Sequence, residues 1–75
     1  MTTATHTDET TGRTYTATLT GTTVEITEGG VWAGTGRWDG SEIQDCAAIL
    51  GGSQDAAERI YEGLSEGLEE ATAED

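Results

Sequence analysis

The sequence predicts an α+β fold: an antiparallel sheet of three to four strands, connected as a meander, packed by one C-terminal amphipathic helix. Short segments of alternating polar and apolar residues are separated by glycine-containing turns, and a long stretch of helical periodicity follows them. A chain of 75 residues has room for one domain with a thin core. We expect a disordered polar tail over residues 1–11, a single domain over residues 12–72 and a frayed acidic end over residues 73–75.

Two segments at the start of this domain are typical of half-buried strands. In residues 13–20, Tyr15, Ala17 and Leu19 alternate with threonines. Residues 23–27 continue the alternation after a two-residue turn that contains glycine. The two segments therefore predict a tight antiparallel hairpin.

The next two segments extend the predicted sheet. Residues 31–38 have the composition of a third strand, and the Asp39-Gly40 turn leads into a fourth over residues 41–50. Apolar residues occur at both odd and even positions of the fourth segment, so the pattern does not decide which face of the strand is buried. A short helical start is the alternative to a strand there.

The C-terminal segment has the clearest periodicity. Ser53 is the expected N-cap, and Asp55 places a favourable negative charge in the first turn of a helix that runs to about Thr72. The apolar arc of this helix consists of Ala57, Ile60, Tyr61, Leu64, Leu68 and Ala71. The opposite side carries a ladder of like charges at i, i+4 spacing, which consists of Glu58, Glu62, Glu66 and Glu70. Each such pair costs about 0.2–0.5 kcal/mol at low salt. We therefore expect the fold to weaken below about 0.5 M salt.

The composition is strongly acidic. The sequence contains fifteen aspartate and glutamate residues, three arginines and no lysine, so its formal charge is −12. This composition, with fifteen threonines and eleven glycines, resembles that of proteins from salt-in haloarchaea, which implies solvent cations around the carboxylates at high salt. Direct nucleic-acid binding and anionic membranes are disfavoured, because phosphate binding needs clustered lysine and arginine.

The sequence carries no catalytic, metal or cofactor signature, and we expect a non-catalytic protein. His6 lies in the polar tail without a second spaced ligand, and Cys46 lies among apolar neighbours as a small buried hydrophobe would. The glycine spacings match neither a dinucleotide fingerprint nor a phosphate-binding loop followed by lysine. Because no segment has the apolar length of a signal peptide or a membrane-spanning helix, the expected location is the cytoplasm.

The third strand contains a candidate binding slot. Strict alternation puts Trp32, Gly34, Gly36 and Trp38 on one face, so that two indoles flank a floor without side chains. Such a slot suits a flat ligand or a side chain of a partner. The alternative is that the helix lies across the glycines and both indoles belong to the core.

Small residues along one edge of the helix form a candidate packing interface. Ala56, Gly63 and Gly67 make a smooth strip there. A glycine inside a helix costs about 1 kcal/mol relative to alanine, so two of them suggest the close approach of another element. That element is either the sheet of the same chain or a second helix in a homodimer or other homo-oligomer, and the sequence leaves both open.

The order of the elements resembles a known family. Strands that begin near Tyr15-Thr16-Ala17, followed by residues 46–52 leading into an acidic helix with Ala56-Ala57 in its first turns, look like small antitoxin domains of the HicB type. The resemblance covers about residues 14–70, and the proline of the usual core motif is missing. It implies an acidic protein that neutralises a basic toxin. Our leading expectation is an accessory or protein-interaction module that acts as a homo-oligomer, with ligand binding in the tryptophan slot and HicB-like neutralisation as alternatives.

Overall fold

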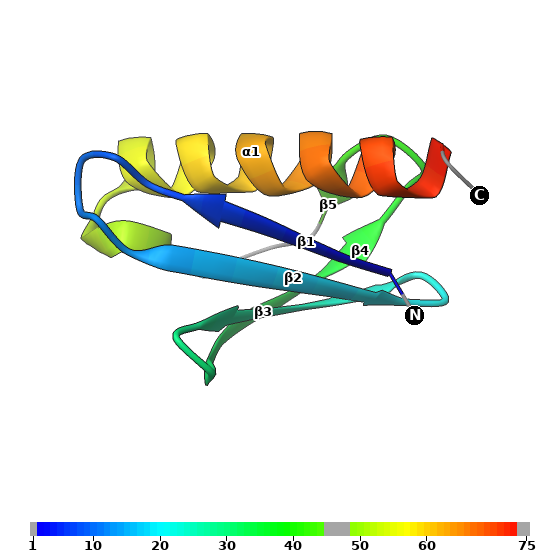
Figure 1. Ribbon diagram of the computed structural model, residues 1–75, viewed down its shortest axis with the longest axis horizontal. Coiled ribbons are helices and arrows are strands. Elements are labelled where there is room, and N and C mark those ends of the chain that lie inside the picture. Colours follow the sequence, from blue (N-terminus) through cyan, green and yellow to red (C-terminus); the bar gives the residue numbers. More distant parts are fainter. Residues whose placement is uncertain (1, 45–48, 74–75) are drawn as a thin grey trace.

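The computed structural model describes residues 2–44 and 49–73, which form one five-stranded antiparallel sheet covered on one face by a long helix (Figure 1). The strands lie in the sheet in their order along the chain, so the predicted α+β meander with a C-terminal helix is confirmed, with one strand more than expected. The elements are β1 (Thr2–Thr7), β2 (Thr14–Thr20), β3 (Thr23–Glu28), β4 (Val31–Trp38), β5 (Ile43–Gln44), a short 3-10 turn η1 (Leu50–Gly52) and α1 (Gln54–Ala73).

The hairpin of β2 and β3 forms as its alternation predicts. Ala17 pairs with Ile26 and Leu19 pairs with Val24, and all four side chains are buried on the face that α1 covers. Gly21 occupies the turn with φ 64°, a conformation that glycine adopts without a steric penalty. The inner face of the sheet is therefore built from every second residue of these strands.

The N-terminal segment is not the unordered tail that its polar composition predicts. Thr2–Thr7 form strand β1, which pairs with β2 along its whole length. Ala4 is buried opposite Ala17, and His6 is half-buried opposite Tyr15. A polar segment is ordered here because its backbone joins the hydrogen-bonded ladder and its inward side chains meet the helix, neither of which its own composition reveals.

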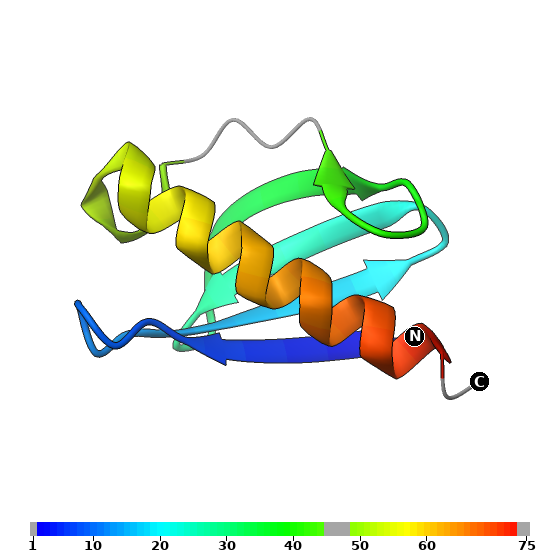
Figure 2. The same ribbon diagram turned by 90° about the horizontal axis from the view of Figure 1, so that it is seen from above.

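Helix α1 begins at the predicted place. The Oγ of Ser53 accepts a hydrogen bond from the backbone N–H of Ala56 at 3.2 Å, which satisfies one of the unpaired donors of the first turn. Ile60, Leu64 and Leu68 are fully buried, as the periodicity predicts. Figure 2 shows the helix crossing the sheet obliquely, with its C-terminal half over β1 and the edge at β5 lying to one side. The core is the layer between this helix and the inner face of the sheet.

The structure describes the two ends of the predicted fourth strand, residues 41–44 and 49–50. Among the described residues 41–44 and 49–50, Ile43–Gln44 pair with β4, and Leu50 belongs to η1. Residues 45–48, which include Cys46, lie outside the described residues, so the prediction of a buried thiol stays a prediction.

Candidate functional site

The face of the sheet turned away from α1 is built mostly from threonine. In β2 every second residue is a threonine that points away from the core, and the register places outward threonines of β1 and β3 beside them. One further threonine comes from β4. The members of this outer face are Thr3, Thr5, Thr7, Thr14, Thr16, Thr18, Thr20, Thr23, Thr27 and Thr35. We call this surface the threonine face.

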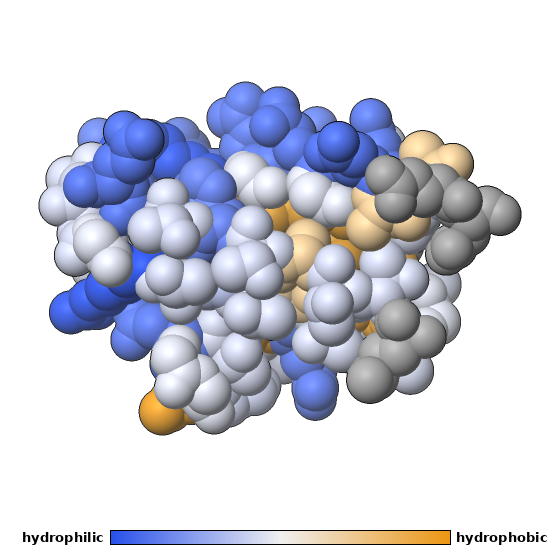
Figure 3. All heavy atoms as spheres, viewed as in Figure 1, coloured by the Kyte–Doolittle hydropathy of each residue, from blue (hydrophilic) through white to orange (hydrophobic). Residues whose placement is uncertain are grey.

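The threonine face is almost uncharged. Among its described residues the charged side chains are Glu25, opposite Thr18 and Thr35, and Arg37, opposite Thr23. Their formal charges cancel, whereas the whole chain carries −12. Figure 3, coloured by hydropathy, shows hydrophilic side chains along the helix and at the end of the molecule with the β1–β2 turn, and paler ones over the middle of β1 and β2. The acidity is therefore unevenly distributed over the molecule.

A β-bulge places Trp32 on the threonine face. The register between β3 and β4 shifts after Ile26, which pairs with Gly34, so that Thr27 pairs with Trp32. The indole Nε1 of Trp32 donates a hydrogen bond to Oγ1 of Thr35 at 3.3 Å, and the side chain is 65% exposed. A bulge adds one residue to one strand and so reverses the alternation beyond it.

The predicted tryptophan slot is therefore not formed. Trp38 is 9% exposed and packs in the core, while Trp32 lies on the opposite face. Gly34 is buried and Gly36 is half-buried, so the glycines do lie on the inner side that the alternative interpretation placed beneath the helix. The structure does not bring the two indoles together. Glycines inside a strand are a signal for a bulge, although they do not fix its position.

The small-residue strip of α1 packs within the chain. A Cβ added at Gly67 would lie 2.8 Å from Cβ of Ala4, and one added at Gly63 would overlap the His6 ring, 2.6 Å from its Cε1. Ala56 is 3% exposed and lies against Gly51 of η1. The glycines thus allow β1 to approach the helix, which is the intramolecular alternative of the two that the sequence left open.

The buried carboxylate of Asp8, in the β1–β2 turn, contacts both this turn and helix α1. Asp8 is 3% exposed, and its carboxylate accepts hydrogen bonds from Oγ1 of Thr11 at 2.9 Å and from the Thr11 backbone N–H at 3.3 Å. Nε of Arg59 in α1 lies 3.5 Å from the same carboxylate. Burial alone would raise the pKa of Asp8, but the Thr11 hydrogen bonds and the Arg59 charge outweigh it, so the pKa is lowered. The sequence does not predict the contact with Arg59; the Asp-x-x-Thr spacing before a glycine is its only local signal.

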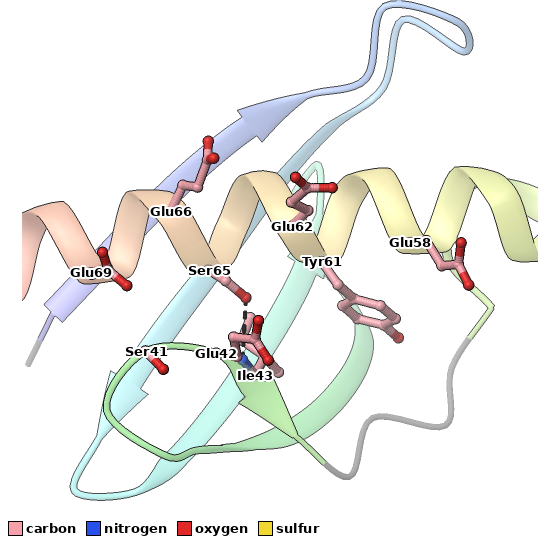
Figure 4. Close-up of a pocket in the computed structure, with 9 residues that line it drawn as sticks. All are labelled: Ser41, Glu42, Ile43, Glu58, Tyr61, Glu62, Ser65, Glu66 and Glu69. Carbon is pink, nitrogen blue, oxygen red and sulfur yellow. Dashed lines mark hydrogen bonds between the residues drawn. The ribbon is translucent and has the colours of Figure 1, made fainter.

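A carboxylate-lined groove of about 560 Å³ lies between α1 and the chain around β5 (Figure 4). Ser65 and Ile43 connect its two sides, because the backbone N–H of Ile43 donates to Oγ of Ser65 at 3.1 Å. The carboxylates that line the groove are Glu42, Glu58, Glu62, Glu66 and Glu69. Figure 4 shows those of α1 spread along the helix, with Glu62 and Glu66 pointing away from Ser65 and Ile43, so the carboxylates do not converge on one point. Across residues 2–44 and 49–73, no group of three potential metal ligands is placed to hold an ion.

A second hollow, of about 380 Å³, lies beside η1 and the β3–β4 turn. Figure 1 shows that this turn curls away from the helix at the end of the sheet near η1. Val31, Trp32 and Ile49 line it, and they are 69%, 65% and 65% exposed. These three are the exposed large hydrophobic side chains of the described part of the chain. We call this hollow the η1 crevice. Exposed apolar side chains gathered in one place are more informative than the same residues scattered singly.

The η1 crevice also has a polar end. Nη1 of Arg13 donates to Oε1 of Glu28 at 3.3 Å, and the two side chains are 58% and 37% exposed. Tyr15 is 1% exposed, and its hydroxyl makes no hydrogen bond of standard geometry with the described residues. Burial raises the pKa of Tyr15, and the nearby Glu28 carboxylate raises it further.

Fold and surfaces together define a small α+β domain with one acidic side, one neutral sheet face and a crevice beside η1 that has an apolar and a charged end. Comparisons with family models, with curated proteins and with solved structures found no match to this chain. Among the residues that the structure describes, no helix combines the length and apolar character needed to cross a membrane.

Proposed function

We propose that this chain is a non-catalytic interaction module that forms a homodimer through its threonine face. The observation that carries the proposal is the neutrality of that face in a chain of charge −12, together with the exposed indole of Trp32 upon it. Tryptophan is enriched among the residues that contribute most to binding at protein interfaces.

The charge distribution favours a second copy as the partner. Two copies that met through their helices would oppose rows of glutamates, whereas two threonine faces bring together methyl and hydroxyl groups. In a two-fold symmetric contact each copy offers the same patch, so Glu25 of one copy can lie near Arg37 of the other. Molar salt screens the remaining repulsion between the two acidic bodies, since the Debye length falls to about 3 Å.

The test inserts one negative charge at the centre of the proposed interface. Thr16 pairs with Thr5 on one side and Thr27 on the other, so Thr16→Glu places a carboxylate in the middle of the face. The matched control is Thr10→Glu, which adds the same charge to the exposed β1–β2 turn. Sedimentation velocity in about 2 M KCl measures the mass of each protein, and circular dichroism verifies that each one is folded.

We expect dimers for the wild type and for Thr10→Glu. Thr16→Glu should weaken dimerisation by about tenfold or more, because a buried uncompensated charge is costly. Trp32→Ala should weaken it as well. A wild-type protein that stays monomeric across the accessible concentration range would rule the proposal out, as would a dimer indifferent to Thr16→Glu.

The carboxylate-lined groove does not by itself support the alternative function, HicB-like neutralisation of a basic protein. Carboxylates line the groove, but a chain of this charge acquires such surfaces through solvent adaptation alone, and the groove presents no buried polar group without a partner among the described residues. Neutralisation of a basic partner therefore stays a prediction from element order.

A further inference from the structure

The η1 crevice gathers apolar groups that the core does not use. The thin core of a small domain makes exposed large hydrophobic side chains costly, yet Val31 and Ile49 line one hollow instead of being buried. Leu50 and Ala33 continue the apolar lining toward the core. The volume of about 380 Å³ lies within the range of pockets that accept small molecules.

The polar end of the crevice offers one positive and one negative group side by side. Arg13 and Glu28 meet through a single 3.3 Å contact, and exposed ion pairs of this kind contribute little stability. A guanidinium has five N–H donors and a carboxylate accepts several hydrogen bonds, so each group has capacity for a ligand. The buried hydroxyl of Tyr15 lies in the same wall, near Glu28 and Arg13, and makes no hydrogen bond of standard geometry with the described residues.

We propose that the η1 crevice binds a free α-amino acid with a large apolar side chain. The ligand carboxylate meets Arg13, its ammonium group meets Glu28, and its side chain lies between Val31 and Ile49. A zwitterion matches the paired charges of the crevice without adding net charge to an acidic protein. Neither an anion nor a cation of the same size satisfies both groups.

The test titrates the folded protein with four probes in about 2 M KCl. L-Phenylalanine carries both charges and an apolar ring, 3-phenylpropanoate carries only the carboxylate, 2-phenylethylamine carries only the ammonium group, and glycine lacks the side chain. Backbone amide NMR shifts of Val31, Ile49 and Gly51 report binding at the crevice, and tryptophan fluorescence gives a second readout. We expect saturable binding of phenylalanine, and binding of the other three that is about tenfold or more weaker.

Substitutions at the polar end assign the roles of the three residues. In Arg13→Gln, phenylalanine should bind no better than 2-phenylethylamine, and in Glu28→Gln it should bind no better than 3-phenylpropanoate. Tyr15→Phe should weaken phenylalanine binding by about threefold to tenfold. The matched control Tyr61→Phe removes a hydroxyl from the carboxylate-lined groove and should leave phenylalanine binding unchanged.

Two outcomes would overturn this assignment. One is the absence of saturable shifts at the crevice with phenylalanine up to about 10 mM, and the other is binding of the single-charge probes as tightly as phenylalanine. Thr16→Glu should retain the site, so loss of dimerisation and loss of ligand binding can be told apart.

Discussion

Gly63 shows how a single residue can determine the position of an element. Glycine is unfavourable inside a helix by about 1 kcal/mol relative to alanine. At this position the missing Cβ leaves space for the ring of His6, and the neighbouring Gly67 does the same for Ala4. The cost in helix propensity is offset by the packing of a whole strand.

We therefore predict opposite effects of Gly63→Ala in two backgrounds. In the wild type the added methyl group overlaps His6, and the free energy of unfolding should fall by about 1–3 kcal/mol. In a His6→Ala background the same substitution should raise it by about 0.5–1 kcal/mol through helix propensity. Urea unfolding of the four proteins in molar salt measures both effects. Stabilisation of the wild type by Gly63→Ala would contradict the packing described above.

Asp8 gives the fold a pH dependence of known sign. Because its pKa is lowered in the folded state, its contribution to stability is fully present above the unfolded-state pKa and is lost as the pH falls through the folded value. Asp8→Asn should therefore be less stable than the wild type at neutral pH, and the difference should shrink below about pH 4. Thermal melts of both proteins across this range provide the test. Protonation of the other carboxylates affects both proteins alike, so a difference that stays constant into acid would argue against the role of Asp8.

At the scale of elements, β1 is the part of the fold on which the helix depends most. It fills the space beside Gly63 and Gly67 and carries the turn in which Asp8 meets Arg59. We predict that removal of residues 1–7 abolishes cooperative unfolding, because α1 then lacks one side of its packing surface. Melting of the shortened chain followed by circular dichroism measures this.

The control for that deletion keeps the strand and changes only its outward side chains. Thr3→Ala with Thr5→Ala should cost less than about 1 kcal/mol per site. If the shortened chain unfolded with the same midpoint and slope as the full chain, β1 would be dispensable.

Local periodicity correctly predicted the elements that carry several buried apolar side chains of their own. It failed for elements whose order depends on contacts with a distant part of the chain. The β2–β3 hairpin and α1 follow from alternation, turn glycines and the Ser53 cap. Strand β1 has only Ala4 as an inward apolar residue, so its order depends on a helix far away in the sequence. The bulge at β4 reverses the parity on which the tryptophan slot was based. The η1 crevice was missed because it joins three separate segments that no spacing relates.

At the scale of the whole molecule, the negative charge is concentrated on the helix side, where few positive side chains lie close enough to offset it. Glu62 lies between Glu58 and Glu66 in the ladder, so Glu62→Gln removes two like-charge pairs. We predict that this substitution raises the free energy of unfolding by about 0.4–1 kcal/mol in dilute buffer. The gain should disappear in about 2 M KCl, where screening already weakens the repulsion.

The matched control for the charge prediction is Glu9→Gln, which removes one negative charge from the exposed β1–β2 turn. It should have a smaller effect in dilute buffer, because it relieves no i, i+4 pair. Chemical unfolding at several salt concentrations distinguishes the two substitutions. Equal gains for both would indicate that net charge, and not the ladder, limits stability at low salt.

The contacts of Gly63 with His6 and of Gly67 with Ala4 also affect the order of folding. The hairpins of the sheet join neighbours in sequence and form at small entropic cost, whereas these contacts close a loop that spans most of the described chain. During synthesis the strands leave the ribosome well before the helix does, with Val24 and Ile26 on an inner face that is not yet covered. We therefore expect the docking of α1 onto β1 to be the last step, and the partly folded sheet to be the species most prone to aggregate.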